Sequence, residues 1–134
     1  MKLDLSSLHL ALATLERAII RASAAPADEE LRDAVIQRFE YSFELCWKML
    51  KRHLEQVLPN PAAVDRLSFK ELIREAAERG LVARVEPWWT YRHQRNLTSH
   101  TYDAKNACAV FETALAFHPD AVALLGEIEK RNVD

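Results

Sequence analysis

Arg95 and His100 lie five residues apart in a segment, residues 88–103, that is rich in aromatic and basic side chains. Arginine stays charged and can hold a phosphate through two parallel N–H donors. Histidine takes up and releases a proton near neutral pH, so it can serve as a general acid or base. An arginine and a histidine that converge on one point provide what the cleavage of a phosphodiester requires.

The same segment is expected to form one helix of about three turns, with Pro87 in its first turn and its end near residues 98–99. Proline suits the first turn, where its missing N–H costs nothing. In an unbroken helix, two residues five apart point in different directions. If the helix ends just before His100, the chain can bend the imidazole back beside the Arg95 guanidinium. Tyr102, in an extended loop, then points to the same side as His100.

The motif from Arg95 to Tyr102, read as Arg-x4-His-x-Tyr, resembles that of HEPN-domain proteins, and Asn96 directly after the arginine fits it. It looks most like the HepT-type toxins and their relatives, the nucleotidyltransferase substrate-binding proteins. Residues 36–48 are similar to the long second helix of that family, and the likeness extends over about residues 8–125. The resemblance implies an HEPN-type fold, an all-α up-and-down bundle of four to five helices, as one domain over residues 1–134.

The resemblance also implies an activity, a metal-independent endoribonuclease that is the toxin of a toxin–antitoxin pair. The ribose 2′-OH of the RNA substrate would attack the adjacent phosphate, with His100 as general base or acid and Arg95 stabilising the phosphate charge. Asn96 would hold His100 or the phosphate in place. A homodimer is expected, because the arginine and histidine of two subunits face one another in this family. A minimal nucleotidyltransferase antitoxin, encoded nearby, would neutralise the toxin by adding AMP to Tyr102.

A function from another class stays open. Relatives of this kind are described as substrate-binding partners of a minimal nucleotidyltransferase. The chain would then be a non-catalytic substrate-binding subunit of a two-component nucleotidyltransferase. The cleft at Arg95 and His100 would bind the acceptor or the partner enzyme. An RNA-cleavage assay on the lone protein separates the two functions.

Each candidate residue also has a purely structural interpretation. Arg95 could pair with a surface glutamate, an interaction worth about 0–1 kcal/mol. His100 could cap the end of a helix, where the dipole favours a cation, and Tyr102 could fill the core. Glu40 and Glu44 lie one turn apart on a long predicted helix. They either belong to a solvated face or orient Arg95 across the bundle.

Four neighbours of the motif are assigned structural positions rather than roles in chemistry. Trp88 and Trp89 are expected in the core or at a dimer interface in preference to stacking on RNA bases. His93 is expected to be a supporting or exposed residue. Arg92 could widen a phosphate-binding patch, but a solvated position is preferred.

Composition limits the possible partners. The chain has 134 residues and a net charge of -2, with a pI of about 6.2, so no overall basic field attracts nucleic acid. An RNA-binding surface must therefore be local, as in residues 84–105, where basic side chains predominate. The N-terminus lacks an apolar signal core, and no apolar run approaches the roughly 18 residues of a membrane span. A cytoplasmic protein with no membrane contact is expected.

Neither a metal nor any other cofactor is expected, because no histidine, cysteine or acid shows metal-ligand spacing. Cys46 and Cys108 are both at apolar helix positions and are predicted to be buried, reduced thiols.

Apolar periodicity and capping residues divide the chain into helices, and no alternating pattern predicts a strand. Residues 59–67 are expected to form a loop. Pro119 is expected to interrupt the last helical region, because a proline inside a helix loses one hydrogen bond and clashes with the preceding turn. The predicted helices cover residues 4–23, 28–57, 68–80, 88–98, 103–118 and 120–131.

Overall fold

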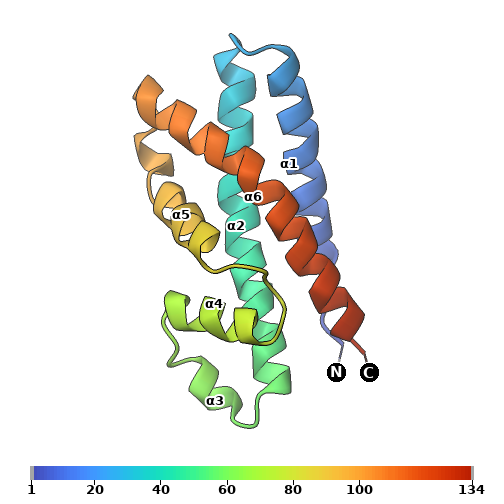
Figure 1. Cartoon of the computed structure of the whole chain (residues 1–134). Coiled ribbons are helices and arrows are strands. Elements are labelled where there is room, and N and C mark those ends of the chain that lie inside the picture. Colours follow the sequence, from blue (N-terminus) through green and yellow to red (C-terminus); the bar gives the residue numbers. More distant parts are fainter. Residues whose placement is uncertain (1, 134) are drawn as a thin grey trace.

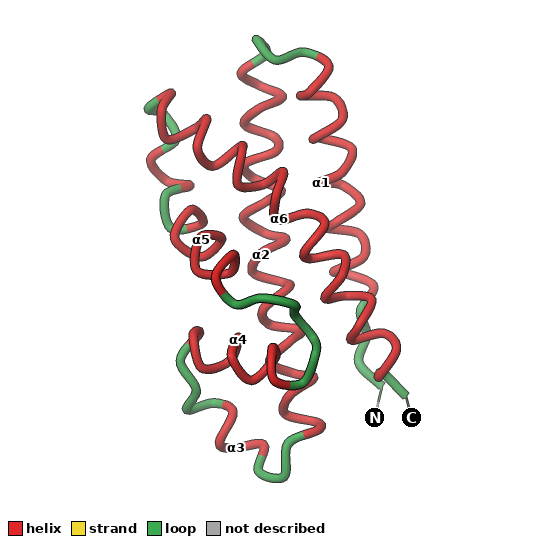
Figure 2. The backbone as a smooth tube through the Cα atoms, in the orientation of Figure 1, coloured by secondary structure: helices red, strands yellow, loops and turns green. Residues whose placement is uncertain are grey.

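The computed structural model describes residues 2–133, and all of the regular structure within that range is helical (Figures 1 and 2). The predicted all-α up-and-down bundle is confirmed. Its helices are α1 (Ser6–Ala24), α2 (Glu29–Val57), α3 (Pro61–Val64), α4 (Phe69–Glu78), α5 (Glu86–Arg95) and α6 (Ala104–Arg131), with a 3-10 turn η1 (Thr98–His100) between the last two.

Helix α2 is the spine of the bundle, and α1 runs antiparallel beside it (Figure 1). Helix α6 crosses both of them diagonally, α5 lies along α6, and α3 and α4 pack near the C-terminal end of α2. The two ends of the chain meet, because the Asn132 side chain donates to Leu3 O and accepts from Leu3 N at 2.9 and 2.8 Å.

A cluster of aromatic rings fixes α5 against α2 and α6. Phe117 of α6 is at its centre, 5.2 Å from the ring of Phe39, 5.4 Å from Tyr91 and 6.1 Å from Trp88. All four side chains are buried. Edge-to-face pairs of this kind add about 0.5–1.5 kcal/mol each to the stabilisation from buried area, so the cluster determines where α5 lies.

The capping residues predicted from the sequence set the helix boundaries. Asp28 and Asp103 accept hydrogen bonds from backbone N–H groups in the first turns of α2 and α6. Ser68 and Glu71 form the expected capping box of α4. Gly80 follows that helix with a φ of 74°, a left-handed conformation that costs glycine little.

The predicted interruption at Pro119 is wrong, because α6 runs through this residue without a break. The proline still lacks the N–H of a helical hydrogen bond, at a cost of about 3 kcal/mol in a helix interior. Its ring is on the exposed side of α6, while Phe117 and Ala121 on either side of it are buried. Burial on both sides of the proline outweighs the local penalty and keeps one helix.

Two further boundaries differ from the prediction. Residues 61–64 form the short helix α3, with Pro61 in the first turn and Asn60 accepting from the backbone of Ala62. Helix α5 ends at Arg95, three residues early. Beyond it the backbone tightens, because Leu97 and His100 donate to carbonyls three residues back.

By length and composition, α6 is apolar enough to cross a membrane, whereas the sequence led to the expectation of no such segment. Core helices of soluble proteins meet the same criterion. The buried residues of α6 recur every three or four positions and pack against the rest of the bundle, so we assign α6 to the protein core.

The two cysteines differ in environment. Cys46 is buried as predicted, and burial raises the pKa of its thiol to about 12. Cys108 is exposed, so the prediction for it is wrong. Its neighbour Ala107 takes the inward position on α6, which leaves Cys108 on the outer face.

Replacing Pro119 with alanine should restore a helical N–H donor and increase the free energy of unfolding by about 1–3 kcal/mol. The matched control is Pro61→Ala, because Pro61 occupies a first helical turn, where no donor is gained. Urea unfolding of both variants measures the difference. Equal effects at the two positions would contradict the idea that α6 is strained by its proline.

Candidate active site and adjoining pocket

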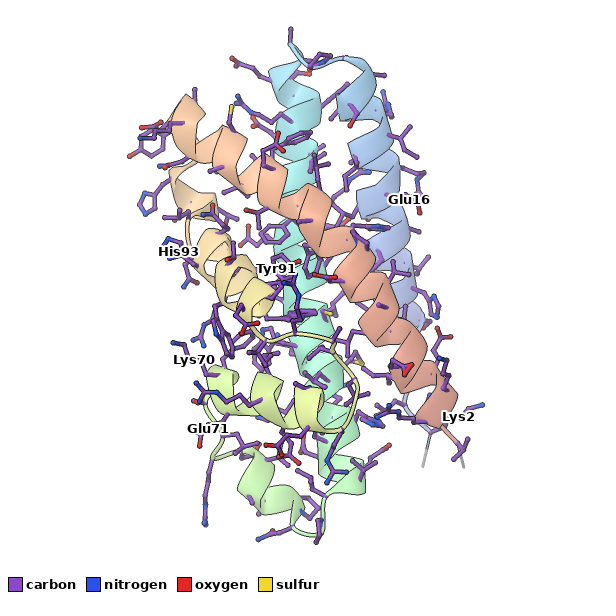
Figure 3. The ribbon with its side chains drawn as sticks, viewed as in Figure 1. Lys2, Glu16, Lys70, Glu71, Tyr91 and His93 are labelled. Carbon is purple, nitrogen blue, oxygen red and sulfur yellow. The ribbon has the colours of Figure 1, made fainter. Side chains whose placement is uncertain are left out.

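Helix α5 carries the site and is held by two buried side chains. Trp88 is only 2% exposed. The Tyr91 hydroxyl donates to Ala116 O at 3.2 Å and to the Asp120 carboxylate, both on α6. Figure 3 shows Tyr91 directed toward α6, whereas His93 lies on the outer side of α5 and is exposed. The buried residues leave the last turn of α5 facing α2.

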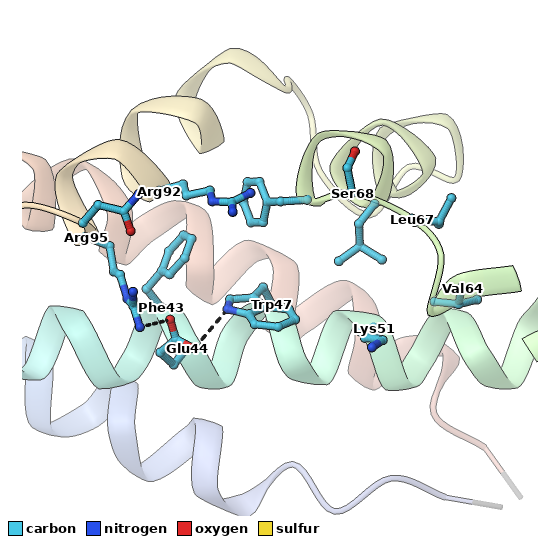
Figure 4. A pocket seen from close by; sticks show the side chains of 12 residues that line it. Phe43, Glu44, Trp47, Lys51, Val64, Leu67, Ser68, Arg92 and Arg95 are labelled. Atoms are coloured by element: carbon cyan, nitrogen blue, oxygen red, sulfur yellow. Dashed lines mark hydrogen bonds and ion pairs between the residues drawn. The ribbon is translucent and has the colours of Figure 1, made fainter. Parts of the chain in front are cut away.

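Arg95 ends α5 and contacts α2 through a carboxylate. Its Nη2 forms an ion pair with Glu44 Oε1 at 2.5 Å. The second oxygen of Glu44 accepts from Trp47 Nε1 at 3.3 Å (Figure 4). The same oxygen lies 4.0 Å from Lys48 Nζ. Arg95 Nε is buried and has no hydrogen-bond partner within residues 2–133. The guanidinium is therefore fixed on one edge by Glu44, while 34% of the Arg95 side chain remains exposed.

Of the two glutamates that the sequence offered as partners for Arg95, the structure brings only Glu44 into contact. Glu40, one turn earlier on α2, is half-buried and forms no ion pair in the described part of the chain. Helical spacing alone makes Glu40 and Glu44 equally good candidates. Which of them contacts Arg95 depends on how α5 crosses α2.

His100 and Tyr102 lie beyond the end of α5, at and just after η1. Both side chains are exposed, and their rings are 6.4 Å apart. Asn106 of α6 donates to the His100 backbone carbonyl at 3.2 Å, which holds the turn in place. Tyr102 is 88% exposed, so the alternative of a core tyrosine is wrong. Among the described residues of this one chain, no hydrogen bond or ion pair joins the Arg95 and His100 side chains.

A pocket of about 430 Å³ opens between α2, α4 and α5 (Figure 4). Arg95 and Asn96 line one end, and Lys51 lies toward the other, 2.8 Å from Asp65. That hydrogen bond is the main cause of a raised pKa at Lys51. Arg92 lies along the wall with its guanidinium 4.9 Å from the Phe69 ring centre.

No local sequence pattern indicated that Lys51 and Phe69 would lie at the candidate site. The sequence predicts a solvated position for Arg92, and its side chain is exposed. It nevertheless lines the pocket, which its spacing of three residues from Arg95 could have indicated. Trp88 is in the core as expected. Trp89 is half-buried and packs on Phe69, 6.2 Å between ring centres.

No group of three or more histidine, cysteine or acidic side chains in residues 2–133 is placed to hold a metal ion.

Comparison with known proteins gives consistent matches along the chain. The family model described as nucleotidyltransferase substrate binding protein like matches residues 3–130. A Haemophilus influenzae protein named probable ribonuclease HepT is 34% identical over 139 residues, which cover 98% of this chain and 95% of that protein.

Two solved structures are also similar. One is a Haemophilus influenzae protein described as the substrate binding domain of a nucleotidyltransferase. It has a TM-score of 0.89 and 33% identity, over 94% of this chain and 99% of that one. The other, a protein from Thermus thermophilus, has a TM-score of 0.70 and 33% identity, over 90% of this chain and 98% of that one.

The fold and the sequence matches together define a helical bundle of the HEPN type. The chain belongs to the nucleotidyltransferase substrate binding protein like family, whose HepT-like members it resembles along nearly its whole length. The resemblance drawn from the Arg-x4-His-x-Tyr motif is thereby confirmed.

Tyr91→Phe should lower the free energy of unfolding at neutral pH by roughly 1–3 kcal/mol, because Asp120 loses its hydrogen-bond donor. Burial, together with the bond to Asp120, raises the pKa of Tyr91 above its ordinary 10.0. Above pH 10.0 the unfolded chain therefore releases a proton that the folded protein retains, and stability falls as the pH rises.

Chemical unfolding at about pH 8 and about pH 11 tests this linkage. The wild type should lose more stability over that range than Tyr91→Phe, since the other tyrosines and the lysines are common to both proteins. Equal losses would show that Tyr91 is not the titrating group.

Proposed function

We propose that the protein is a HepT-like endoribonuclease that cleaves RNA with Arg95 and His100 and without a metal ion. The observation that carries this proposal is the Glu44-anchored guanidinium of Arg95, followed five residues later by an exposed histidine. The relative named probable ribonuclease HepT, which matches along almost the whole chain, supports it.

The chemistry needs only the groups of the RNA and of this site. The ribose 2′-oxygen attacks the adjacent phosphorus, and the bond from phosphorus to the 5′-oxygen breaks. His100 takes the proton from the 2′-OH or gives one to the leaving 5′-oxygen. Arg95 stabilises the charge on the non-bridging oxygens, and Asn96 at the end of α5 helps to hold the phosphate. The products are a 2′,3′-cyclic phosphate and a 5′-hydroxyl.

The site is proposed to be completed by a second copy of the chain. Within one chain, no hydrogen bond or ion pair joins the side chains of Arg95 and His100 across the described residues, and His100 is exposed. A two-fold axis beside η1 would set the histidine of one subunit against the arginine of the other without any new sequence.

Control of the enzyme is proposed to act through Tyr102, as the antitoxin step of a cytoplasmic toxin–antitoxin pair. Its exposed hydroxyl is accessible to a minimal nucleotidyltransferase, and its ring is 6.4 Å from that of His100. AMP attached there would add bulk and a negative phosphate beside the residue that must meet the RNA backbone. Both effects oppose binding of another phosphate.

The second candidate is a non-catalytic substrate-binding subunit of a two-component nucleotidyltransferase. It is favoured by the solved relative described as a substrate binding domain and by the open pocket next to Arg95. Under this function the purified chain binds but does not cut RNA.

Arg95→Ala and His100→Ala should each reduce RNA cleavage by about 10²–10⁴-fold, the usual effect of removing a charge-stabilising or acid–base group. The assay uses partner-free protein and end-labelled RNA. His93→Ala and Arg52→Ala are matched controls, because both change exposed side chains outside the site. A wild-type protein that neither cuts RNA nor arrests growth would leave the binding subunit as the function.

Tyr102→Phe should retain ribonuclease activity and escape silencing, because it keeps the ring but removes the oxygen that accepts AMP. Intact-protein mass spectrometry after co-expression with the neighbouring nucleotidyltransferase would detect the adduct. The wild type should gain one AMP, and the variant none. An adduct on a different residue, or its absence with an active partner, rules out this mode of control.

A further inference from the structure

The pocket beside Arg95 is long enough and large enough to hold a small ligand. Glu44, Trp47 and Lys51 follow one face of α2, seven residues or about 10 Å from end to end. The start of α4 and the last turn of α5 form the opposite side (Figure 4). Its volume of about 430 Å³ is within the range of pockets that enclose small ligands.

Charge in the pocket favours an anion. Three cations and one carboxylate line it. Glu44 contacts Arg95 and Asp65 contacts Lys51, whereas Arg92 forms no ion pair with any described residue. Arg92 and Arg95 are three residues apart on α5 and so face the same side. Two guanidinium groups at this spacing can hold one phosphate from two directions.

The rest of the pocket suits a flat aromatic group. Trp47 is half-buried on the α2 side, and Phe69 is half-buried on the α4 side. Leu67 and Val64 add apolar lining toward the end of the pocket away from Arg95 (Figure 4). Asn96 adds an amide that can both donate and accept hydrogen bonds, as the edge of a nucleobase requires.

We propose that this pocket binds one nucleotide, with its phosphate between Arg92 and Arg95 and its base against Trp47 and the apolar lining. The nucleotide comes either from an RNA strand, next to the phosphate that is cleaved, or from a free mononucleotide. Binding of a nucleotide within an RNA strand rests on the proposed ribonuclease function. Binding of a free mononucleotide does not depend on that function. Glu44 links the two halves of the site, since it contacts both Arg95 and Trp47.

Isothermal titration calorimetry of the full chain tests the proposal, because its signal does not depend on the pocket tryptophan. The ligands are a 2′-O-methyl oligoribonucleotide, which lacks the nucleophile and is not cleaved, AMP, and inorganic phosphate. Arg92→Ala is the main variant, because its exposed side chain can be removed without disturbing the core. Arg74→Ala is the matched control: Arg74 also lies over an aromatic ring, Trp89 at 5.8 Å, but not in the pocket. Trp47→Leu removes the stacking surface, with circular dichroism to verify folding.

The wild type should bind the oligonucleotide more tightly than inorganic phosphate. Arg92→Ala and Trp47→Leu should each weaken binding by about tenfold or more, and Arg74→Ala by less than about twofold. Tight AMP binding with the same response to the variants assigns the pocket to a free nucleotide. Affinities that are unchanged in both pocket variants overturn the proposal. Binding of the uncleavable oligonucleotide does not depend on catalysis. If the protein binds it but shows no ribonuclease activity on ordinary RNA, the proposed reaction is contradicted and the nucleotide site is not.

Discussion

One ion pair, between Glu44 of α2 and Arg95 at the end of α5, sets the geometry of the site. Both side chains are partly exposed, so the pair contributes little to stability, about 0–1 kcal/mol. Its importance is positional. It orients the guanidinium of a side chain that otherwise has many rotamers, and through Trp47 it connects that guanidinium with the wall of the pocket. The proposed chemistry and the proposed nucleotide site therefore share a single carboxylate.

The ion pair in turn depends on the scaffold that presents α5. A helix of ten residues is marginal in isolation, and α5 gains its stability from Trp88 and Tyr91, which pack on α6. The partners of Tyr91 on α6, Phe117 and Asp120, lie on either side of Pro119. They are held in register only because α6 continues through the proline. Packing around one aromatic cluster thus keeps α6 continuous through Pro119. The same packing holds α5, and with it Arg95, in place.

Local signals made much of this fold predictable. Asp28, Ser68 and Asp103 cap helices where their side chains can reach free backbone N–H groups, and the structure agrees. Features that arise from packing between helices were not predictable in this way. The rule that proline interrupts a helix is local, and at Pro119 it is outweighed by the burial of Phe117 and Ala121. Helical spacing makes Glu40 and Glu44 equally possible partners for Arg95. Only the crossing of α5 over α2 selects Glu44. Lys51 joins the site because α4 folds back across α2, which no local pattern indicates.

The most direct measurement compares the RNA-cleavage kinetics of Glu44→Gln with those of the wild type, using Glu55→Gln on the same helix as the control. Glutamine keeps the size of the side chain but removes the charge that orients Arg95. We predict that kcat/KM falls about tenfold or more while the unfolding midpoint changes little, since Glu44 orients Arg95 and also contacts Trp47 in the proposed nucleotide site. Equal kcat/KM values, or no cleavage by the wild type, would contradict a catalytic Arg95 positioned by Glu44.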